Sequence, residues 1–244
     1  MRARAPLRMV PLLMLVLLPA TFASKVSSAR APLVAGRPGP ASAGTGPVNN
    51  PCKESAYTFD GSKWHRTFRW SFSAGTRPSG LRAKAVELAL RRAASNVARS
   101  RNSCGLTDHV GATQAYQGRT RARPDIRDDS TCGKPDGRSV VGFGKLVASE
   151  LALTCFWTRN GRTVEADIKL NRSDYHWYVK KPSTCANKWS IAAVATHEFG
   201  HAFGLNHVSE VTDGALTMSP LILSCQQQEA TLGLGDVRGL RALY

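Results

Sequence analysis

Residues 197–207 read HEFGHAFGLNH and combine three histidines, one glutamate and two glycines. On a helix, His197 and His201 are four positions apart, so they project from one face and can bind a single ion. Imidazole nitrogen is a good ligand for zinc, and the H-E-x-x-H spacing places the carboxylate of Glu198 beside the metal as a general base. The pattern predicts a hydrolytic metal site rather than a structural histidine-rich helix.

Two histidines alone make a weak catalytic site, so a third ligand is needed. Gly204 can adopt a left-handed conformation at low cost, and the chain can then turn and bring His207 back to the ion. Three neutral histidines leave one coordination position open for water. Zinc lowers the pKa of that water and polarises a substrate carbonyl, and Glu198 can carry a proton to the leaving amine.

The helix that would carry these residues has a recognisable start and end. Ser190 is a good N-cap, apolar residues such as Ile191 and Val194 offer packing, and the helix should run to about Phe203. Gly204 then stands where a C′ glycine belongs.

The other elements follow from apolar periodicity. Alternation predicts strands at 68–72, at 110–116, and in a hairpin over 151–157 and 164–170 with an Asn160-Gly161 turn. Helical spacing predicts a long helix around 86–97 and a closing helix at 235–244. Strands beside helices predict an α+β domain.

Composition divides the chain into three parts. Residues 1–23 resemble a secretory signal peptide, with a basic start and a short apolar run. Residues 24–51 are rich in Pro, Gly and Ala and are predicted to be a linker or short pro-segment, which leaves 52–244 as the catalytic domain. No other run is long enough to span a membrane. We therefore expect a secreted, extracellular protein.

Charge and cysteine content add two expectations. The formal net charge is +16, which indicates a basic and mostly solvated surface. No nucleic-acid motif accompanies that charge, so nucleic acid is not an expected partner. The six cysteines all lie beyond the predicted signal, and an even count in a secreted chain favours disulfides, although 15 pairings remain open.

The eleven-residue motif resembles the signature of the metzincin metalloproteases, and most closely that of the matrixin group. LTMSP resembles the methionine turn of that clan, with Met218 as its methionine and Pro220 as the matrixin proline; the tail LGLGDVRGLRALY resembles the matrixin closing helix, with Asp236 as the residue that buttresses the turn. The segment EADIKLN resembles the edge strand that pairs with substrate, which implies a substrate-binding role for Glu165, Ala166, Asp167 and Ile168. The implied fold is a metzincin catalytic domain with a twisted mixed sheet, an active-site helix and a small C-terminal subdomain.

The chain also departs from the matrixin pattern. Ser219 replaces the usual tyrosine, and too few histidines remain for the second, structural zinc of vertebrate matrixins. Calcium stays open through the loop residues Asp125, Asp128, Asp129 and Asp136. CGKPD, from Cys132, resembles the latency motif of matrixin zymogens, but it follows the first strands, so a disulfide is the favoured interpretation; Cys52 stays open as either a latency ligand or a disulfide partner.

These observations predict a secreted, monomeric endopeptidase with one catalytic zinc that cleaves proteins or peptides. The alternative is a non-enzymatic zinc-containing protein whose basic surface binds anionic polymers. Glu198 argues against that alternative, because a structural zinc site gains nothing from a carboxylate beside an open position. The composition, rich in arginine and alanine, suggests a bacterial source of high genomic GC content.

Overall fold

The structure, a computed structural model, describes residues 27–36 and 50–244. The predicted signal peptide, residues 1–23, lies outside these ranges. The strands are β1 (Ser27–Gly36), β2 (Thr58–Phe59), β3 (Phe68–Ser73), β4 (Gln114–Thr120), β5 (Ser139–Gly144), β6 (Glu150–Arg159), β7 (Arg162–Asn171), β8 (His176–Tyr178), β9 (Lys188–Ser190), β10 (Leu205–Asn206) and β11 (Leu221–Leu223). The helices are α1 (Ala83–Ala98), α2 (Ile191–Ala202), α3 (Glu210–Asp213) and α4 (Leu234–Leu243), with short 3-10 turns η1 (Ala74–Thr76) and η2 (Gln228–Ala230).

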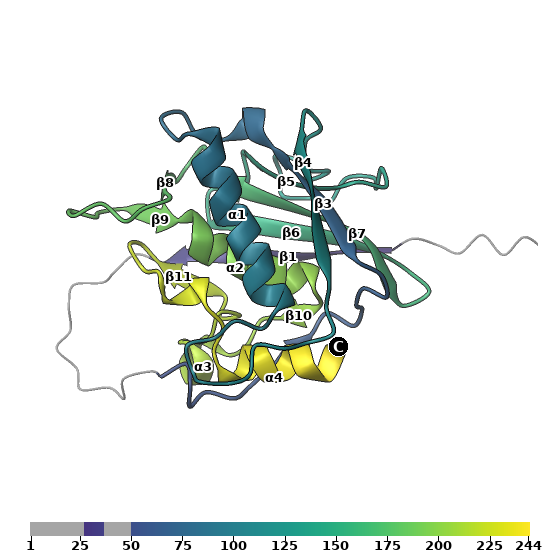
Figure 1. Cartoon of the computed structure of the whole chain (residues 1–244). Coiled ribbons are helices and arrows are strands. Elements are labelled where there is room, and N and C mark those ends of the chain that lie inside the picture. Colours follow the sequence, from purple (N-terminus) through teal and green to yellow (C-terminus); the bar gives the residue numbers. More distant parts are fainter. Residues whose placement is uncertain (1–26, 37–49) are drawn as a thin grey trace, which may run out of the picture.

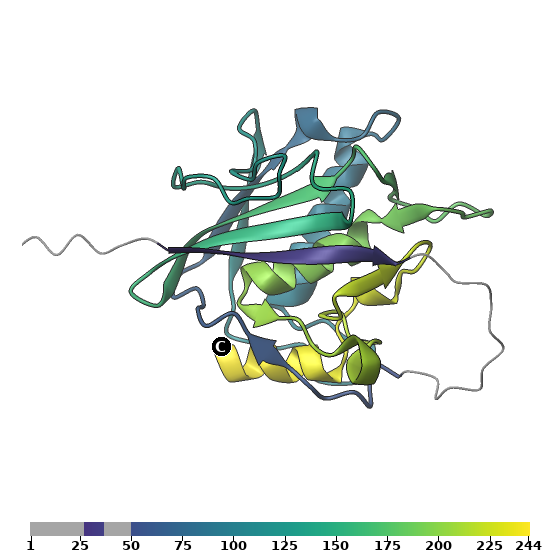
Figure 2. The ribbon, with the colours of Figure 1, turned by 180° about the vertical axis from the view of Figure 1, so that it is seen from behind.

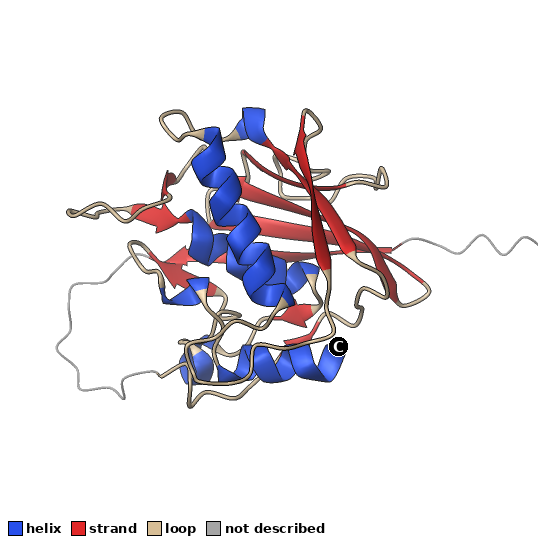
Figure 3. Cartoon of the chain, in the orientation of Figure 1, coloured by secondary structure: helices blue, strands red, loops and turns tan. Residues whose placement is uncertain are grey.

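One mixed sheet organises the domain, with strand order β11-β1-β6-β7-β5-β3-β4. β6 runs antiparallel to both of its neighbours, β7 and β1, and the other pairings are parallel. Helices α1 and α2 pack on the same face of this sheet, and α4 lies below them at the C-terminus (Figures 1 and 3). The predicted α+β class is therefore confirmed.

The sheet has an apolar cluster on each face. On the helix side, the alternating residues of β3 are fully buried, and Phe68 and Trp70 both contact Phe199 of α2. On the other side, a smaller cluster that includes Leu153 and Trp157 lies with Ile126, from the loop that follows β4. Burial on both faces fixes the register of the central strands, because a one-residue slip would exchange the faces.

Several local predictions are confirmed. The β6–β7 hairpin turns at Asn160 and Gly161, which have φ values of 52° and 71° as a type I′ turn requires. Helices α1 and α4 lie where periodicity placed them. The second strand was only partly right, since β4 begins at Gln114 rather than near residue 110.

The edge-strand prediction for Glu165–Ile168 is wrong. These residues lie in β7, which pairs with β6 on one side and with β5 on the other, so β7 has no free edge. Within the β6–β7 hairpin, β6 is the strand nearer to β11 in the sheet.

Of the two predictions for residues 24–51, the linker needs correction over residues 27–36, and the short pro-segment stays a prediction. Residues 27–36 form β1, which pairs with β6 and β11 inside the sheet. Composition could not predict this strand, because its main-chain pairing depends on partners more than 100 residues away.

All six cysteines form disulfides: Cys52–Cys104, Cys132–Cys155 and Cys185–Cys225. The predicted disulfide at Cys132 is confirmed, and neither Cys132 nor Cys52 has a free thiol. Among the described residues, no helix combines the length and apolar character that crossing a bilayer requires.

Candidate metal centre and active site

Helix α2 presents His197 and His201 toward the same point. Ser190 caps the helix, as predicted, by accepting a hydrogen bond from the Ala193 N–H. The Nε2 atoms of His197, His201 and His207 form a triangle with sides of 3.0, 3.0 and 3.1 Å. A tetrahedral zinc with Zn–N bonds of about 2.0–2.1 Å would separate its ligand nitrogens by about 3.3–3.4 Å. The three side chains therefore fit one zinc ion after small adjustments.

The hydrogen bonds of the Nδ1 atoms show which tautomer His197 and His201 adopt. His197 Nδ1 lies 2.6 Å from the Thr217 carbonyl oxygen, and His201 Nδ1 lies 2.9 Å from that of Leu205. A carbonyl only accepts, so each Nδ1 carries the proton and each Nε2 directs a lone pair inward. Burial and the neighbouring imidazoles lower the pKa of His197 well below its ordinary value and that of His207 to about 3. Converging nitrogen atoms on neutral rings could hold a metal ion between them.

A turn after α2 brings His207 close to His197 and His201. The helix ends at Ala202, one residue before the predicted end, and Gly204 adopts a φ of +102°. Strand β10 then pairs with β2, and the Thr58 hydroxyl donates to the His207 carbonyl. Asp60, just after β2, places Oδ2 3.5 Å from His201 Nδ1. No sequence pattern predicts this contribution of residues 58–60, because β2 has only two residues and no periodicity.

We expect Gly204→Ala to weaken metal binding and to destabilise the fold by about 1–3 kcal/mol. An added Cβ would meet the Ser62 carbonyl oxygen at 2.3 Å, on a backbone whose positive φ already disfavours a side chain. Zinc titration and urea denaturation would measure both effects. Gly161→Ala is the matched control, because Gly161 also has a positive φ but has open space at the Cβ position. Equal losses in the two variants would contradict a role for the turn in placing His207.

Glu198 lies beside the histidine triangle and is fully buried. The Thr154 hydroxyl, from β6, donates to Glu198 Oε2, whereas Oε1 has no hydrogen-bond partner among the described residues. Burial raises the pKa of Glu198 to about 7, against the lowering effects of His201 and of the Thr154 hydrogen bond. A buried carboxylate with one oxygen held and the other free is suited to taking a proton from a bound water. Nothing in the sequence pointed to Thr154 as a partner of Glu198.

Thr154→Val should lower the cleavage rate about tenfold or more, since a hydrogen bond to a charged group contributes about 1.5–3 kcal/mol. Because the Thr154 hydrogen bond lowers the pKa of Glu198, its loss should also move the acidic limb of the pH–rate profile to higher pH. Thr154→Ser, which keeps the hydroxyl, should restore both properties. A rate loss with an unmoved acidic limb in Thr154→Val would indicate a packing defect instead.

Beneath the metal centre, Met218 packs against α2. Its Sδ lies 2.3 Å from where a Cβ on Gly200 would stand, so only glycine fits there without a shift. Asp236 at the start of α4 accepts hydrogen bonds from the Thr217, Met218 and Gly233 N–H groups. The turn that holds His197 is thus itself fixed by a buried carboxylate. Pro220 follows this turn and leads into β11.

Comparison with known protein families gives a match to the family model described as Matrixin over residues 132–244. This part of the chain is a matrixin-like metzincin domain. The match spans β5 to α4 and so includes all three histidines, Glu198, Met218 and Asp236. A search of curated proteins found no match. The matrixin-like domain supports metallopeptidase activity in general.

The acidic residues predicted to contact substrate, Glu165 and Asp167, instead accept hydrogen bonds from backbone N–H groups. Glu165 accepts from the Asp136 and Gly137 N–H groups, and Asp167 accepts from those of Val140 and Asp125. Both carboxylates therefore fix the loop after β4 rather than facing the histidines.

The predicted calcium ligands are only partly brought together. Asp125 and Asp136 join Glu165 in a cluster whose ligand oxygens lie within 4.8 Å of one another. Asp128 instead pairs with Lys169, and Asp129 bonds to Thr131. Nothing in this geometry favours calcium over a hydrated acidic cluster.

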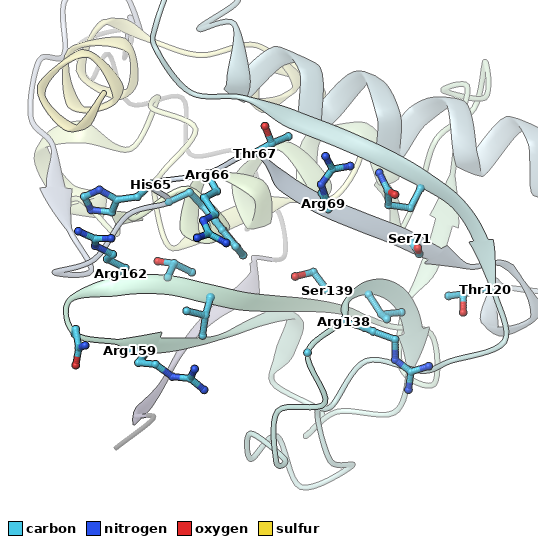
Figure 4. A pocket seen from close by; sticks show the side chains of 17 residues that line it. His65, Arg66, Thr67, Arg69, Ser71, Thr120, Arg138, Ser139, Arg159 and Arg162 are labelled. Carbon is cyan, nitrogen blue, oxygen red and sulfur yellow. The ribbon is translucent and has the colours of Figure 1, made fainter. Parts of the chain in front are cut away.

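A groove of about 1120 Å³ lies on the other face of the sheet, between β3, β4 and the β6–β7 hairpin (Figure 4). Its lining includes five arginines and no carboxylate: Arg66, Arg69, Arg138, Arg159 and Arg162. Part of the predicted basic surface is gathered here. None of the three histidines lines this groove, and neither does Glu198, so it is separate from the place where a bond would be cut.

Proposed function

We propose that this protein is a secreted zinc-dependent endopeptidase that hydrolyses peptide bonds by metal-activated water. One observation carries the proposal: three histidine Nε2 atoms converge at 3.0–3.1 Å beside a buried carboxylate that keeps one oxygen free. The matrixin-like domain supports the same reaction class. The three disulfides are consistent with an extracellular location.

Each residue of the site has a separate role in the proposed reaction. A zinc ion held by His197, His201 and His207 would polarise the substrate carbonyl and lower the pKa of the attacking water. Glu198 takes a proton from that water through Oε1 while the water oxygen attacks the carbonyl carbon. As the C–N bond breaks, Glu198 returns the proton to the amine nitrogen, so no charge is left on the leaving group. Thr154 fixes the rotation of the Glu198 carboxylate throughout.

Cleavage of an unfolded protein by the purified chain, together with metal analysis, tests the proposal. We expect one zinc per chain, loss of cleavage with a chelator, and recovery when zinc is restored. The assay should be repeated after N-terminal trimming, so that latency is not mistaken for inactivity. Stoichiometric zinc without hydrolysis before or after trimming would overturn the proposal and favour the binding-protein alternative.

A further inference from the structure

The arginine-lined groove of Figure 4 occupies a gap in the sheet between β3 and β7. Strand β5 lies between these two strands, but its pairing with β3 begins only at Ser139, opposite Trp70. At the other end of the gap, a bridge between Lys63 and Arg162 joins the two sides. Because β5 does not extend into the space between these two closures, the surrounding side chains form a groove there.

The side chains around this gap carry one sign of charge. Arg66 and Arg69 line it from the β3 side. Arg159 and Arg162 line it from the β6–β7 hairpin. None of these four forms an ion pair with an acid in the described part of the chain, and the fifth arginine, Arg138, pairs with the carboxylate two residues before it. A concave surface lined by one sign of charge focuses the field and concentrates ions of the opposite sign.

Two of these arginines lie directly opposite each other across the hairpin. Arg159 on β6 is in register with Arg162 on β7, beside the turn at Asn160 and Gly161. Like charges at opposite positions of antiparallel strands destabilise the pairing. The hairpin gains nothing from this pair, whereas an anion bound between the two guanidinium groups would replace repulsion with attraction.

The remaining lining indicates what kind of anion fits. Hydroxyl and amide side chains are interspersed with the arginines: Thr67, Ser71, Gln117, Thr120 and Asn160. Guanidinium groups bind oxyanions through paired hydrogen bonds, and hydroxyl and amide groups both donate to and accept from other hydroxyls. The volume of about 1120 Å³ is above the 300–1,000 Å³ of typical small-molecule sites. An oligomer that alternates acidic groups with hydroxyls, such as an acidic polysaccharide, matches both features.

Nucleic acid fits this groove less well. Single-stranded nucleic acid is bound through aromatic side chains on which the bases stack. Trp64 is the one tryptophan, tyrosine or phenylalanine that lines the groove, and its ring already stacks on Phe68 with centroids 4.8 Å apart. Its indole N–H donates to the Ala202 carbonyl at 2.7 Å, so the ring is held in place. The groove therefore offers charge to a nucleic acid but no stacking surface.

An acidic peptide is also a poorer match. A peptide added to a sheet gains affinity from main-chain hydrogen bonds. Two β7 N–H groups beside the gap already have acceptors, since Thr163 donates to the Lys63 carbonyl and Ala166 donates to the Ser139 hydroxyl. Recognition in the groove therefore depends on side chains rather than on an added main-chain ladder.

We propose that the arginine-lined groove binds an acidic polysaccharide, with carboxylate or sulfate groups along its chain, and anchors the protein to it. Arg69 alternates on β3 with Phe68 and Trp70, which contact α2, so the groove and the histidines lie on opposite faces of the sheet. Figure 2, viewed from behind, shows the sheet in front of α1. The histidine site therefore stays open while the groove is occupied. This inference does not require the chain to cleave peptides.

The first experiment is calorimetric titration of the zinc-loaded full chain carrying Glu198→Gln, so that no peptide probe is cleaved. The probes are oligogalacturonate, dextran sulfate, oligoglutamate and oligothymidylate of matched charge, with neutral dextran as the blank. At about 0.1 M salt, where long-range attraction is screened, one or both acidic saccharides should bind. Their affinity should exceed that of oligoglutamate about tenfold, the effect of two or three additional neutral hydrogen bonds. Equal or tighter binding of oligoglutamate or oligothymidylate, or no binding of either acidic saccharide, would overturn the inference.

The second experiment compares two double variants that remove the same charge. Arg159→Gln with Arg162→Gln should weaken saccharide binding about tenfold or more, because hydrogen bonds between charged groups are lost. Arg92→Gln with Arg238→Gln, at exposed positions outside the groove, is the control and should change binding about threefold or less. Equal losses would show that only net charge matters and would overturn the inference.

Stability and catalysis supply the remaining readouts. The groove variant should resist urea at least as well as the control, because it removes the repulsion between Arg159 and Arg162. A larger loss of stability than in the control would mean that the arginines serve the fold and would contradict the inference. Saturating saccharide should not change the rate at which the parent chain cleaves a short uncharged peptide. A parent chain without any cleavage would contradict the proposed function and leave the binding results in force.

Discussion

Glu198→Gln should lower the rate of peptide cleavage by about 10²–10⁴-fold while the protein keeps its zinc. The amide has nearly the same shape as the carboxylate and still accepts the hydrogen bond from Thr154. It cannot take a proton from water, so only polarisation by the metal and positioning remain. The three histidines are untouched, and metal content should stay at one ion per chain.

The companion variant His201→Ala separates metal binding from proton transfer. It removes one apex of the histidine triangle and should lose both zinc and activity. Initial rates with a peptide substrate and metal analysis on the same samples would measure the contrast. More than about a tenth of the parent rate in Glu198→Gln would mean that another group accepts the proton, because general-base catalysis contributes at least about a hundredfold. Loss of zinc in Glu198→Gln would instead place the carboxylate among the metal ligands.

Local patterns predicted the part of this site that lies on one segment. The spacing of His197 and His201, the cap at Ser190 and the left-handed Gly204 all follow from short-range backbone geometry. A helix dictates which side chains share a face, and a glycine marks where the chain can turn back. These features need no knowledge of distant residues.

The predictions that failed concern residues whose environment depends on distant parts of the chain. Glu165, Asp167 and Lys169 look like the solvent-facing side of an edge strand, yet the structure buries all three. Their partners are backbone N–H groups, the Ile126 carbonyl and the Asp128 carboxylate, 27 to 43 residues away in the loop after β4 and at the start of β5. Alternation identifies the two faces of a strand, but not its neighbours or what covers it. Strand β1 was missed for the same reason, since main-chain pairing has no side-chain signature.

Asp236→Ala should reduce the free energy of unfolding by about 3 kcal/mol or more, since each buried donor left without a partner costs about 1–3 kcal/mol. The carboxylate accepts hydrogen bonds at 2.9 Å from Thr217, 3.2 Å from Met218 and 2.8 Å from Gly233. Asp236 is 1% exposed, so water cannot replace these bonds without entering the core. Denaturant unfolding of the zinc-free protein measures this loss without a contribution from metal binding.

The same substitution should weaken zinc binding about tenfold, as expected when the outer partners of a metal ligand are disturbed. The Thr217 N–H donates to Asp236, and the Thr217 carbonyl accepts from His197 Nδ1. If the turn is less firmly held, the His197 ring is therefore free to rotate. Asp236→Asn is the discriminating control. Its remaining oxygen can still accept from Thr217 and Gly233, but its amide group would face the Met218 N–H, so intermediate losses are expected. If Asp236→Ala lost stability but bound zinc as tightly as the parent, the turn would support the fold without orienting His197. If neither property changed, the three hydrogen bonds would contribute nothing to the fold or to the site.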